Sequence, residues 1–208
     1  MGSLNDTPNF GKHFAVLNLD WMHILINAIQ HTDEGKKLIQ SCTRWNDAVH
    51  QLHPRPLTVF STLAFACGQP EVEANKPFAR LIAPFGKFES GSKDTQIDSR
   101  FLLDDKDIVI QKTRWSATTG NSLEQILKAQ GIDTVVISGL SLSGVVMSTI
   151  YRLFDLDYNI FVIVDNVVEL PVDQTEVFSK VLCDNLLPKM NLKVISLEQA
   201  LTALVKSQ

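Results

Sequence analysis

The sequence is poor in cysteine, has no long hydrophobic run and carries no excess of basic residues. Its three cysteines, Cys42, Cys67 and Cys183, are odd in number and far apart, so they indicate neither a disulfide framework nor a CxxC metal site. We therefore expect a reducing, cytoplasmic environment. The net charge of −4 and the isoelectric point near 5.7 argue against nucleic acid and anionic membranes as partners.

No apolar run approaches the roughly 20 residues that a membrane-spanning helix needs, so we expect no membrane partner. Residues 1–13 are polar and lack the apolar segment of a signal peptide, and we interpret them as an N-terminal tail. Of the 208 residues, 45% are hydrophobic and 20% are charged, which is typical of a folded globular protein. This length suffices for one domain with a substantial core, which we place at residues 14–206.

Short apolar segments alternate with segments of helical periodicity along the chain. The apolar segments predict six strands, at residues 14–20, 57–61, 107–112, 134–138, 159–164 and 192–195. The periodic segments predict helices at residues 24–52 (with a break near Thr32), 121–130, 143–156, 172–186 and 197–205. Continuously apolar strands that alternate with helices are typical of a parallel sheet covered on both faces. The sequence therefore predicts an α/β fold: a three-layer, Rossmann-like domain with a six-stranded parallel sheet.

Residues 64–100 are the least regular part of the sequence. They contain three prolines and three glycines and only a short apolar patch. An irregular insertion of this length is typical of a lid or a binding loop. A surface segment packed by its own aromatic residues is an equally good interpretation, and the sequence leaves both open.

Three of the predicted strands end in groups that can take part in chemistry. Asp20 ends the first strand, Lys112 ends the third, and the turn at residues 139–145 follows the fourth. Ligands of open α/β sheets bind beyond the carboxyl ends of the strands, so these groups converge if the strands are neighbours. A lysine beside a desolvated aspartate helps to set its protonation and lets it act as general acid or base. The alternatives are structural: Asp20 as the N-cap of the following helix, and Lys112 as a solvated lysine.

Four segments together resemble the isochorismatase-like (cysteine hydrolase) superfamily. That family's first strand ends in an apolar-apolar-Asp pattern, which corresponds to residues 18–20, and its third strand delivers a Lys-x-basic/aromatic-Ser-Ala block, which corresponds to residues 112–117. Residues 138–149 align with its Gly-x-x-Thr-x-x-Cys-Val-x-x-Thr turn, and residues 158–165 complete the resemblance. The resemblance covers residues 14–204 and implies the isochorismatase-like hydrolase fold. Members often assemble as dimers or tetramers, so it also implies a homodimer or homotetramer.

Two departures from the family pattern change the expected mechanism. Leu142 stands where the family has Thr, and Val145 stands at the position equivalent to the nucleophilic Cys. Valine cannot attack a carbonyl, so the family's thioester mechanism is not expected at this position. The Asp-x-His metal pattern of the nicotinamidase branch is also missing, since residues 61–65 offer no ligand set. We therefore expect neither a metal nor another cofactor.

True isochorismatases also lack the cysteine, and they resemble this chain in the Lys-x-Arg-aromatic-Ser-Ala block. Their reaction, hydrolysis of a vinyl ether, needs a proton on carbon and a water rather than a nucleophilic side chain. The resemblance implies that Asp20 is the general acid and that Lys112 orients or tunes it. It also implies that the turn shapes the pocket, through Leu140, Ser141, Ser143 and Gly144.

Aromatic residues near the strand ends are candidates for the pocket wall. They are Trp21, Phe65, Phe85, Phe88 and Trp115, of which Trp21 and Trp115 are the better candidates because they flank Asp20 and Lys112. Aromatic residues are more often part of a core, and this is the alternative for all five. His23 is a further candidate, with an exposed or helix-packing histidine as its alternative.

The expected function is hydrolase or lyase chemistry on a small organic molecule by Asp20 and Lys112, without a cysteine nucleophile. We expect the substrate to be a vinyl ether, an enol or a related secondary metabolite. A first alternative is a catalytically silent family member that binds a small ligand or a partner. A second alternative is ester or amide hydrolysis with Ser141 or Ser143 as the nucleophile, although Ser143 also suits the N-cap of the following helix.

Overall fold

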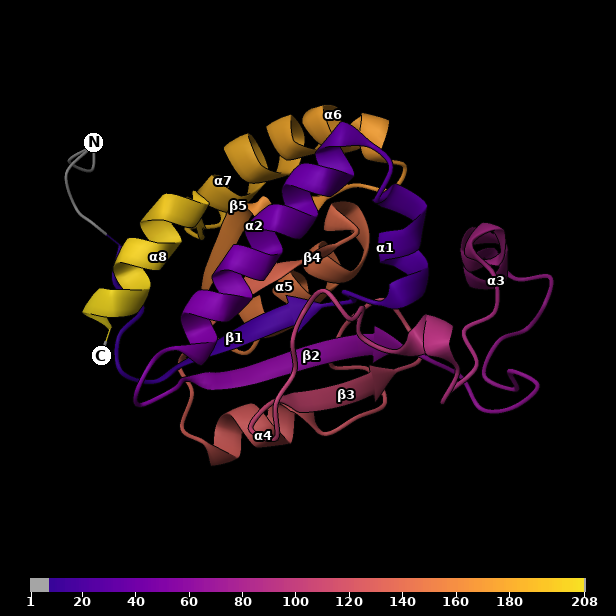
Figure 1. The fold of residues 1–208 in the computed structure, drawn as a ribbon, viewed down its shortest axis with the longest axis horizontal. Coiled ribbons are helices and arrows are strands. Elements are labelled where there is room, and N and C mark those ends of the chain that lie inside the picture. Colours follow the sequence, from indigo (N-terminus) through magenta and orange to yellow (C-terminus); the bar gives the residue numbers. More distant parts are fainter. Residues whose placement is uncertain (1–7, 208) are drawn as a thin grey trace.

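A six-stranded parallel sheet forms the centre of the molecule (Figure 1). The computed structural model describes residues 8–207, so most of the predicted N-terminal tail lies outside the described residues. Every strand pairs in parallel with its neighbours. This arrangement confirms the predicted α/β fold. The strands are β1 Phe14–Leu19, β2 Leu57–Leu63, β3 Ile108–Lys112, β4 Thr134–Leu140, β5 Asn159–Val168 and β6 Lys193–Ile195.

The order of the strands in the sheet is β3-β2-β1-β4-β5-β6. The chain therefore builds outward from β1 to β3, returns to the centre, and continues from β4 to β6. The strand order reverses between β1 and β4, and ligands of open α/β sheets bind beyond the carboxyl ends of the strands at such a point. In Figure 1 these ends point towards α1 (His23–Ile29) and α3 (Pro77–Ile82).

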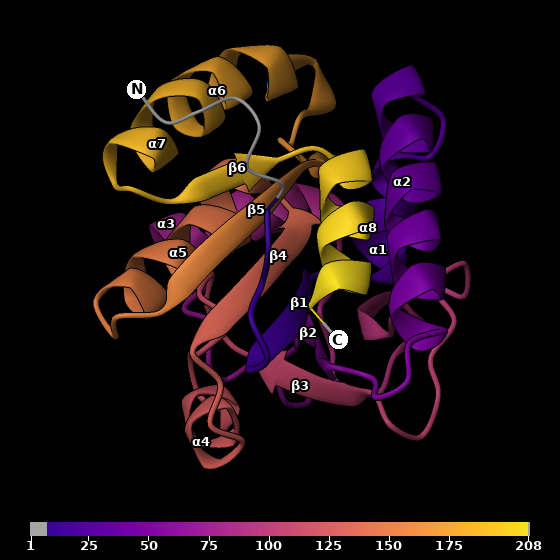
Figure 2. The same cartoon turned by 90° about the vertical axis from the view of Figure 1, so that its left-hand side faces the viewer.

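Helices cover both faces of the sheet (Figure 2). One face packs against α1, α2 (Asp33–His50) and α8 (Leu197–Lys206), and these helices share one cluster of buried apolar residues. The other face packs against a second such cluster. Its helices are α4 Leu123–Ala129, α5 Met147–Phe154, α6 Thr175–Val181 and α7 Leu187–Lys189.

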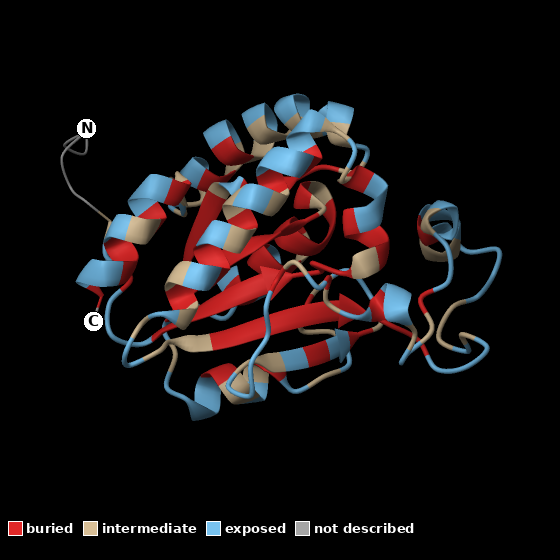
Figure 3. Ribbon diagram, viewed as in Figure 1, coloured by how far each residue is buried: buried red, intermediate tan, exposed pale blue. Residues whose placement is uncertain are grey.

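The central strands are buried on both sides, as Figure 3 shows. All six residues of β1 are buried. Phe14 and Val16 belong to the cluster under α2, whereas Ala15, Leu17 and Leu19 belong to the cluster under α5. This alternation follows from the two-residue repeat of a strand, and it explains why the strands read as continuous apolar runs.

Several predicted boundaries differ from the structure. The break within residues 24–52 is confirmed: Thr32 Oγ1 accepts the N–H of Gly35 at 3.0 Å and caps α2. The helix predicted at residues 143–156 instead begins with a π-helical turn at Leu142–Val146, with Ser141 at the N-cap. The prediction of Ser143 as N-cap is therefore wrong, because its place is inside this turn.

The segment after β4 is also more irregular than the sequence suggests. Strand β5 continues to Val168 instead of ending at residue 164. The helix predicted at residues 172–186 is divided into a 3₁₀ turn at Val172–Gln174, helix α6 and a π-helical turn at Leu182–Leu186. Among the described residues, no helix is both long and apolar enough to cross a membrane.

The insertion at residues 64–100 contains α3 and lies beyond the carboxyl ends of the strands (Figure 1). An antiparallel bridge between Met22 and Ile97 attaches it to the body, and an isolated parallel bridge between Phe65 and Glu89 joins two parts of the insertion itself. The aromatic pair of Phe65 and Phe88, with centroids 6.4 Å apart, packs its base. The two interpretations of this insertion are compatible, because it is packed by its own aromatic residues and it also lines a cavity beside Asp20.

Candidate active site

The carboxyl ends of β1, β2 and β3 bring Asp20, Ser61 and Lys112 together. Asp20 Oδ2 lies 2.8 Å from Lys112 Nζ, and Ser61 Oγ donates a hydrogen bond to Asp20 Oδ1 at 2.8 Å. Lys112 Nζ also donates to the carbonyl oxygen of Arg114 at 3.0 Å. The sequence predicted the convergence of Asp20 and Lys112, but it did not indicate that Ser61 joins them.

Neither structural alternative for this pair describes the molecule. The N-cap of α1 is Met22, and the Asp20 side chain is engaged by Ser61 and Lys112 instead. The Lys112 side chain has no exposed surface. Asp20 has a φ of 59°, a left-handed conformation that aspartate tolerates better than most residues. Its backbone N–H donates to the Ser61 carbonyl at 3.0 Å, which holds this turn against β2.

The protonation of Asp20 reflects two opposing effects. Burial raises the pKa of its carboxyl above the ordinary value, and the nearby Lys112 ammonium and Ser61 hydroxyl oppose this rise without cancelling it. The protonated form is therefore easier to populate than in an exposed aspartate. After the carboxyl loses a proton, the ammonium group stabilises the carboxylate. Such a group can act as a general acid or base.

A small cavity of about 150 Å³ lies beside this pair. Four of its lining residues carry polar side chains: Asp20, Ser141, Ser143 and Glu169. The other lining residues form an apolar wall: Leu25, Leu63, Leu81, Ile82, Phe85, Phe88, Trp115, Leu140, Val145 and Leu170. No lysine or arginine is among these described lining residues. The cavity is smaller than a typical drug-sized pocket of roughly 300–1,000 Å³, so it fits a ligand of few atoms.

The turn after β4 forms one side of the cavity. Leu140, Ser141, Ser143 and Val145 line it, and the peptide between Leu140 and Ser141 is cis. Gly144 does not line the cavity. A Cβ at this position would lie 2.6 Å from Ser141 Oγ and 3.2 Å from the Trp115 ring, so glycine allows the indole to lie against the turn.

Of the five aromatic residues predicted for the pocket wall, the structure places three at the cavity: Phe85, Phe88 and Trp115. Trp115 lines it and is 41% exposed. Trp21 is fully buried and packs against Phe60 and Phe101, and Phe65 packs against the cavity residue Phe88, so these two follow the core interpretation.

His23 also lies outside the cavity lining. Its Nδ1 lies 3.0 Å from Asp98 Oδ2, in a contact between α1 and the insertion. The histidine is therefore occupied by a structural partner.

Glu169 is a site residue that the sequence analysis missed. It follows β5, is 3% exposed and lines the cavity. Its Oε2 accepts the backbone N–H of Ser143 at 2.8 Å, and its Oε1 accepts that of Leu170 at 2.9 Å. A carboxylate thus occupies a backbone donor of the turn that follows β4. An acidic residue directly after an apolar strand was the available signal, but the strand was predicted to end too early.

One group of possible metal ligands exists among residues 8–207: His50, Asp104 and Asp107. It lies before the amino end of β3, and none of its members lines the cavity. Arg55 forms ion pairs with both aspartates, so a guanidinium already provides the positive charge there. These residues do not suit a metal that would assist chemistry at Asp20.

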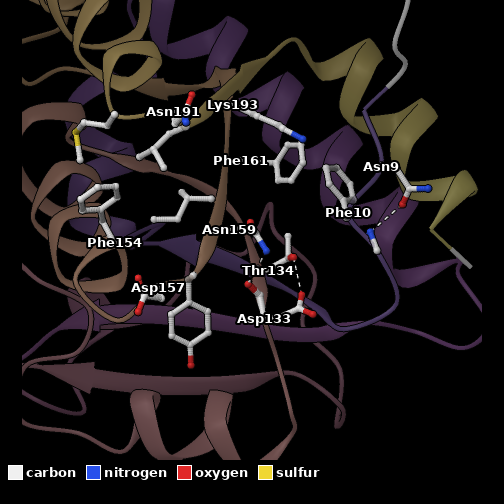
Figure 4. Close-up of a pocket in the computed structure, with 15 residues that line it drawn as sticks. Asn9, Phe10, Asp133, Thr134, Phe154, Asp157, Asn159, Phe161, Asn191 and Lys193 are labelled. Atoms are coloured by element: carbon white, nitrogen blue, oxygen red, sulfur yellow. Dashed lines mark hydrogen bonds between the residues drawn. The ribbon is translucent and has the colours of Figure 1, made fainter.

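A larger cleft of about 620 Å³ lies at the opposite ends of the strands (Figure 4). It is bordered by Asp133 before β4, Asn159 at the start of β5 and Lys193 at the start of β6. Two of its charged side chains, Asp133 and Lys193, contact neighbouring residues. Thr134 Oγ1 donates to Asp133 Oδ1 at 2.6 Å, and the Lys193 ammonium lies 4.9 Å from the centre of the Phe161 ring. This cleft contains none of the predicted site residues.

Comparisons with known proteins agree with this architecture. A family model described as "Isochorismatase domain" matches residues 14–199. The uncharacterized isochorismatase family protein YwoC of Bacillus subtilis is 30% identical over 136 residues, which are 65% of this chain and 66% of that protein. An N-carbamoylsarcosine amidase of Arthrobacter sp. is 40% identical over 55 residues, 26% of this chain and 21% of that protein. Both matches thus span less than two thirds of the relative's length.

The fold also matches solved structures. A cysteine hydrolase from Pseudomonas syringae pv. phaseolicola superimposes with a TM-score of 0.78, covering 100% of both chains at 11% sequence identity. At this low identity the match concerns the fold alone.

Proposed function

The chain belongs to the isochorismatase family of hydrolases, and on this premise we propose that it acts on a small organic molecule through acid–base chemistry of Asp20 and Lys112. The observation that carries the proposal is the buried 2.8 Å pair of these two residues at a small, mostly apolar cavity. The proposed reaction needs no covalent intermediate, in keeping with Val145 at the position equivalent to the family's nucleophile. The resemblance seen in the sequence is confirmed at the level of the family, and the mechanism is our proposal.

Asp20 is the proton donor in this proposal. Burial raises the pKa of its carboxyl, which favours the acid form that can transfer a proton to a substrate carbon. Lys112 then stabilises the resulting carboxylate. The Ser61 hydroxyl can donate to the carboxylate and accept from the carboxylic acid, so it orients Asp20 in both protonation states.

A vinyl ether suits this arrangement. The proton adds to the alkene carbon and leaves an oxocarbenium ion, water adds to that ion, and the hemiketal breaks down to an alcohol and a carbonyl compound. The overall reaction consumes one water and needs no nucleophilic side chain. An enol is the related alternative, since protonation of its carbon gives the keto form. None of the described lining residues is a lysine or an arginine, which favours a substrate without a carboxylate.

The Ser143–Glu169 hydrogen bond also favours a vinyl ether or an enol over an ester or an amide as the substrate. Acyl-transfer reactions need donors that stabilise an oxyanion. Here the carboxylate of Glu169 already accepts the Ser143 N–H, and its negative charge disfavours an oxyanion nearby. Ester or amide hydrolysis at this turn is therefore disfavoured.

The test is turnover of neutral vinyl ethers and enols in D₂O, followed by NMR. Deuterium on the former alkene carbon reports protonation at that carbon, and the rate above the enzyme-free rate reports catalysis. We expect the Asp20→Asn variant to lose about 10²–10⁴-fold in turnover, the usual contribution of a general acid. The matched control is Asp133→Asn, the same change in the cleft at the other end of the sheet. Full turnover by Asp20→Asn on a substrate identified in this way would overturn the proposal.

A catalytically silent, ligand-binding member is the second candidate, and the apolar Val145 in the cavity wall favours it. It predicts that a ligand raises the melting temperature of the wild-type protein and Asp20→Asn alike, with no product formed. Turnover that depends on Asp20 would exclude it.

Serine-dependent hydrolysis is the third candidate, because Ser141 and Ser143 both line the cavity. No histidine is among the described lining residues to act as their base. Mass spectrometry after incubation with p-nitrophenyl acetate should detect an acyl adduct on one of the two serines. If neither serine is acylated, this candidate fails.

A further inference from the structure

Glu169 presents a second carboxylate to the cavity. Its two oxygens each accept one backbone N–H, from Ser143 and from Leu170. A carboxylate oxygen can accept two hydrogen bonds, so each retains capacity for another donor. The side chain is buried and borders the cavity, so a ligand can supply that donor.

The charge of Glu169 is not offset by a side chain as that of Asp20 is. Asp20 is paired with Lys112, whereas none of the ion pairs formed among residues 8–207 includes Glu169. The helical turn that begins at Leu142 compensates part of the charge through its amino end. A buried carboxylate nevertheless remains costly without a cation. The cavity therefore favours a positive group and disfavours a second anion.

The rest of the cavity suits a compact apolar body. Phe85, Phe88 and Trp115 supply aromatic surface to its wall. Its volume is about 150 Å³, and a dry apolar cavity of that size accommodates benzene in another protein. A single ring with one short substituent therefore fits the available space.

We propose that the cavity selects small molecules in which an apolar body carries an ammonium group, with Glu169 as the residue that accepts the ammonium N–H. Carboxylates of the same size are rejected by the same residue. This inference rests on the proposed function only in that it concerns the same cavity. It names the substrate class, and it can be tested by binding without any turnover.

The test compares three ligands of nearly equal shape by isothermal titration calorimetry at neutral pH: benzylamine, benzyl alcohol and benzoate. We expect the Kd of benzylamine to be about tenfold to hundredfold lower than that of benzyl alcohol, as for a hydrogen bond to a charged group. Benzoate should bind most weakly. The inference is overturned if benzylamine has no advantage over benzyl alcohol, if benzoate binds best, or if benzylamine does not bind at millimolar concentration.

The Glu169→Gln variant assigns this preference to one residue. The glutamine side-chain oxygen can still accept the Ser143 N–H, so the turn retains a partner while the charge is lost. We expect the preference for benzylamine over benzyl alcohol to disappear in this variant. The matched control is Asp133→Asn, which removes a carboxylate in the cleft at the other end of the sheet and should retain the preference. The assignment to Glu169 fails if Glu169→Gln retains the preference or if Asp133→Asn removes it.

The wild-type ligand comparison remains decisive if Glu169→Gln does not fold. Failure of the two proposals is also distinguishable. A preference for benzylamine without any Asp20-dependent turnover supports the ligand class and contradicts the acid–base mechanism. Asp20-dependent turnover of neutral substrates with no preference for benzylamine supports the acid–base mechanism and contradicts the ligand class.

Discussion

The cavity at the carboxyl ends of the strands differs in size and in charge burial from the cleft at their amino ends. At the carboxyl ends, a cavity of about 150 Å³ is lined by Asp20, which pairs with Lys112 outside the lining, and both side chains are almost completely buried. At the amino ends, a cleft of about 620 Å³ contains Asp133 and Lys193, which contact their own neighbours at the surface (Figure 4). The charged side chains of the larger cleft therefore lie at the surface, whereas those beside the smaller cavity are buried.

The comparison shows that buried charge is a better guide to a functional site than volume. Removing two charges from water is expensive, and a buried ion pair often adds nothing to stability relative to well-packed apolar residues. A pair placed beside a cavity at the point where the strand order reverses is better explained by chemistry. The same type of substitution made at each end of the sheet tests this explanation.

The largest expected effect on stability follows removal of the buried lysine. Lys112→Met leaves the Asp20 carboxylate buried without its partner, and removal of one member of a buried pair typically costs about 3–5 kcal/mol. Lys193→Met, the same change in the cleft, removes only an exposed contact with Phe161, worth about 0.5–1 kcal/mol. Urea unfolding of both variants at neutral pH measures the difference. Equal losses of stability would remove the distinction between the two ends.

A smaller effect is expected from the glycine beneath Trp115. In Gly144→Ala the new methyl group meets Ser141 Oγ and the Trp115 ring, and such overpacking typically costs about 1–3 kcal/mol. The ring has to shift, so the fluorescence of Trp115 and its quenching by iodide should change.

Gly11→Ala, in the cleft, is the matched control for this change. Gly11 has a φ of 77° with open space around it, so alanine there costs about 1–2 kcal/mol of backbone strain without affecting Trp115. The proposed contact between the turn and Trp115 is wrong if Gly144→Ala leaves the tryptophan signal unchanged.

The sequence predicts the fold well because the dominant signal is local. Each buried strand is a short apolar run, and Asp20 and Lys112 stand at the ends of two such runs. In a parallel sheet, carboxyl ends share one edge, so their convergence needs only the correct strand order. The π-helical turn after β4 was not predicted, since its apolar residues have the same composition as an ordinary helix.

The missed site residues show where sequence reasoning fails. Ser61 becomes a partner of Asp20 only because β2 pairs with β1, a contact between residues 41 positions apart. Glu169 depends on the end of β5 lying beside the turn after β4. Trp21 next to Asp20 was expected at the cavity, but the left-handed backbone of Asp20 redirects the chain, and the indole packs into the core. These three placements are tertiary, and no local pattern encodes them.

The smallest expected effect is a difference in pH dependence between two buried aspartates. The raised pKa of Asp20 means that the folded state binds its proton more tightly, so its contribution to stability is present at low pH and declines as pH rises through the raised pKa. Asp98 has a lowered pKa, despite the opposing effect of its burial, because Arg100 and His23 bond its carboxylate. Its contribution is therefore present above the ordinary pKa and is lost as pH falls.

Relative to the wild type, Asp20→Asn should thus become more stable with rising pH and Asp98→Asn less stable. Chemical denaturation between about pH 4 and 8 measures both slopes, and we expect the Asp20 slope to be shallow because Lys112 opposes the effect of burial. Slopes of the same sign would contradict the assignment of Asp20 as a carboxyl group tuned towards its acid form.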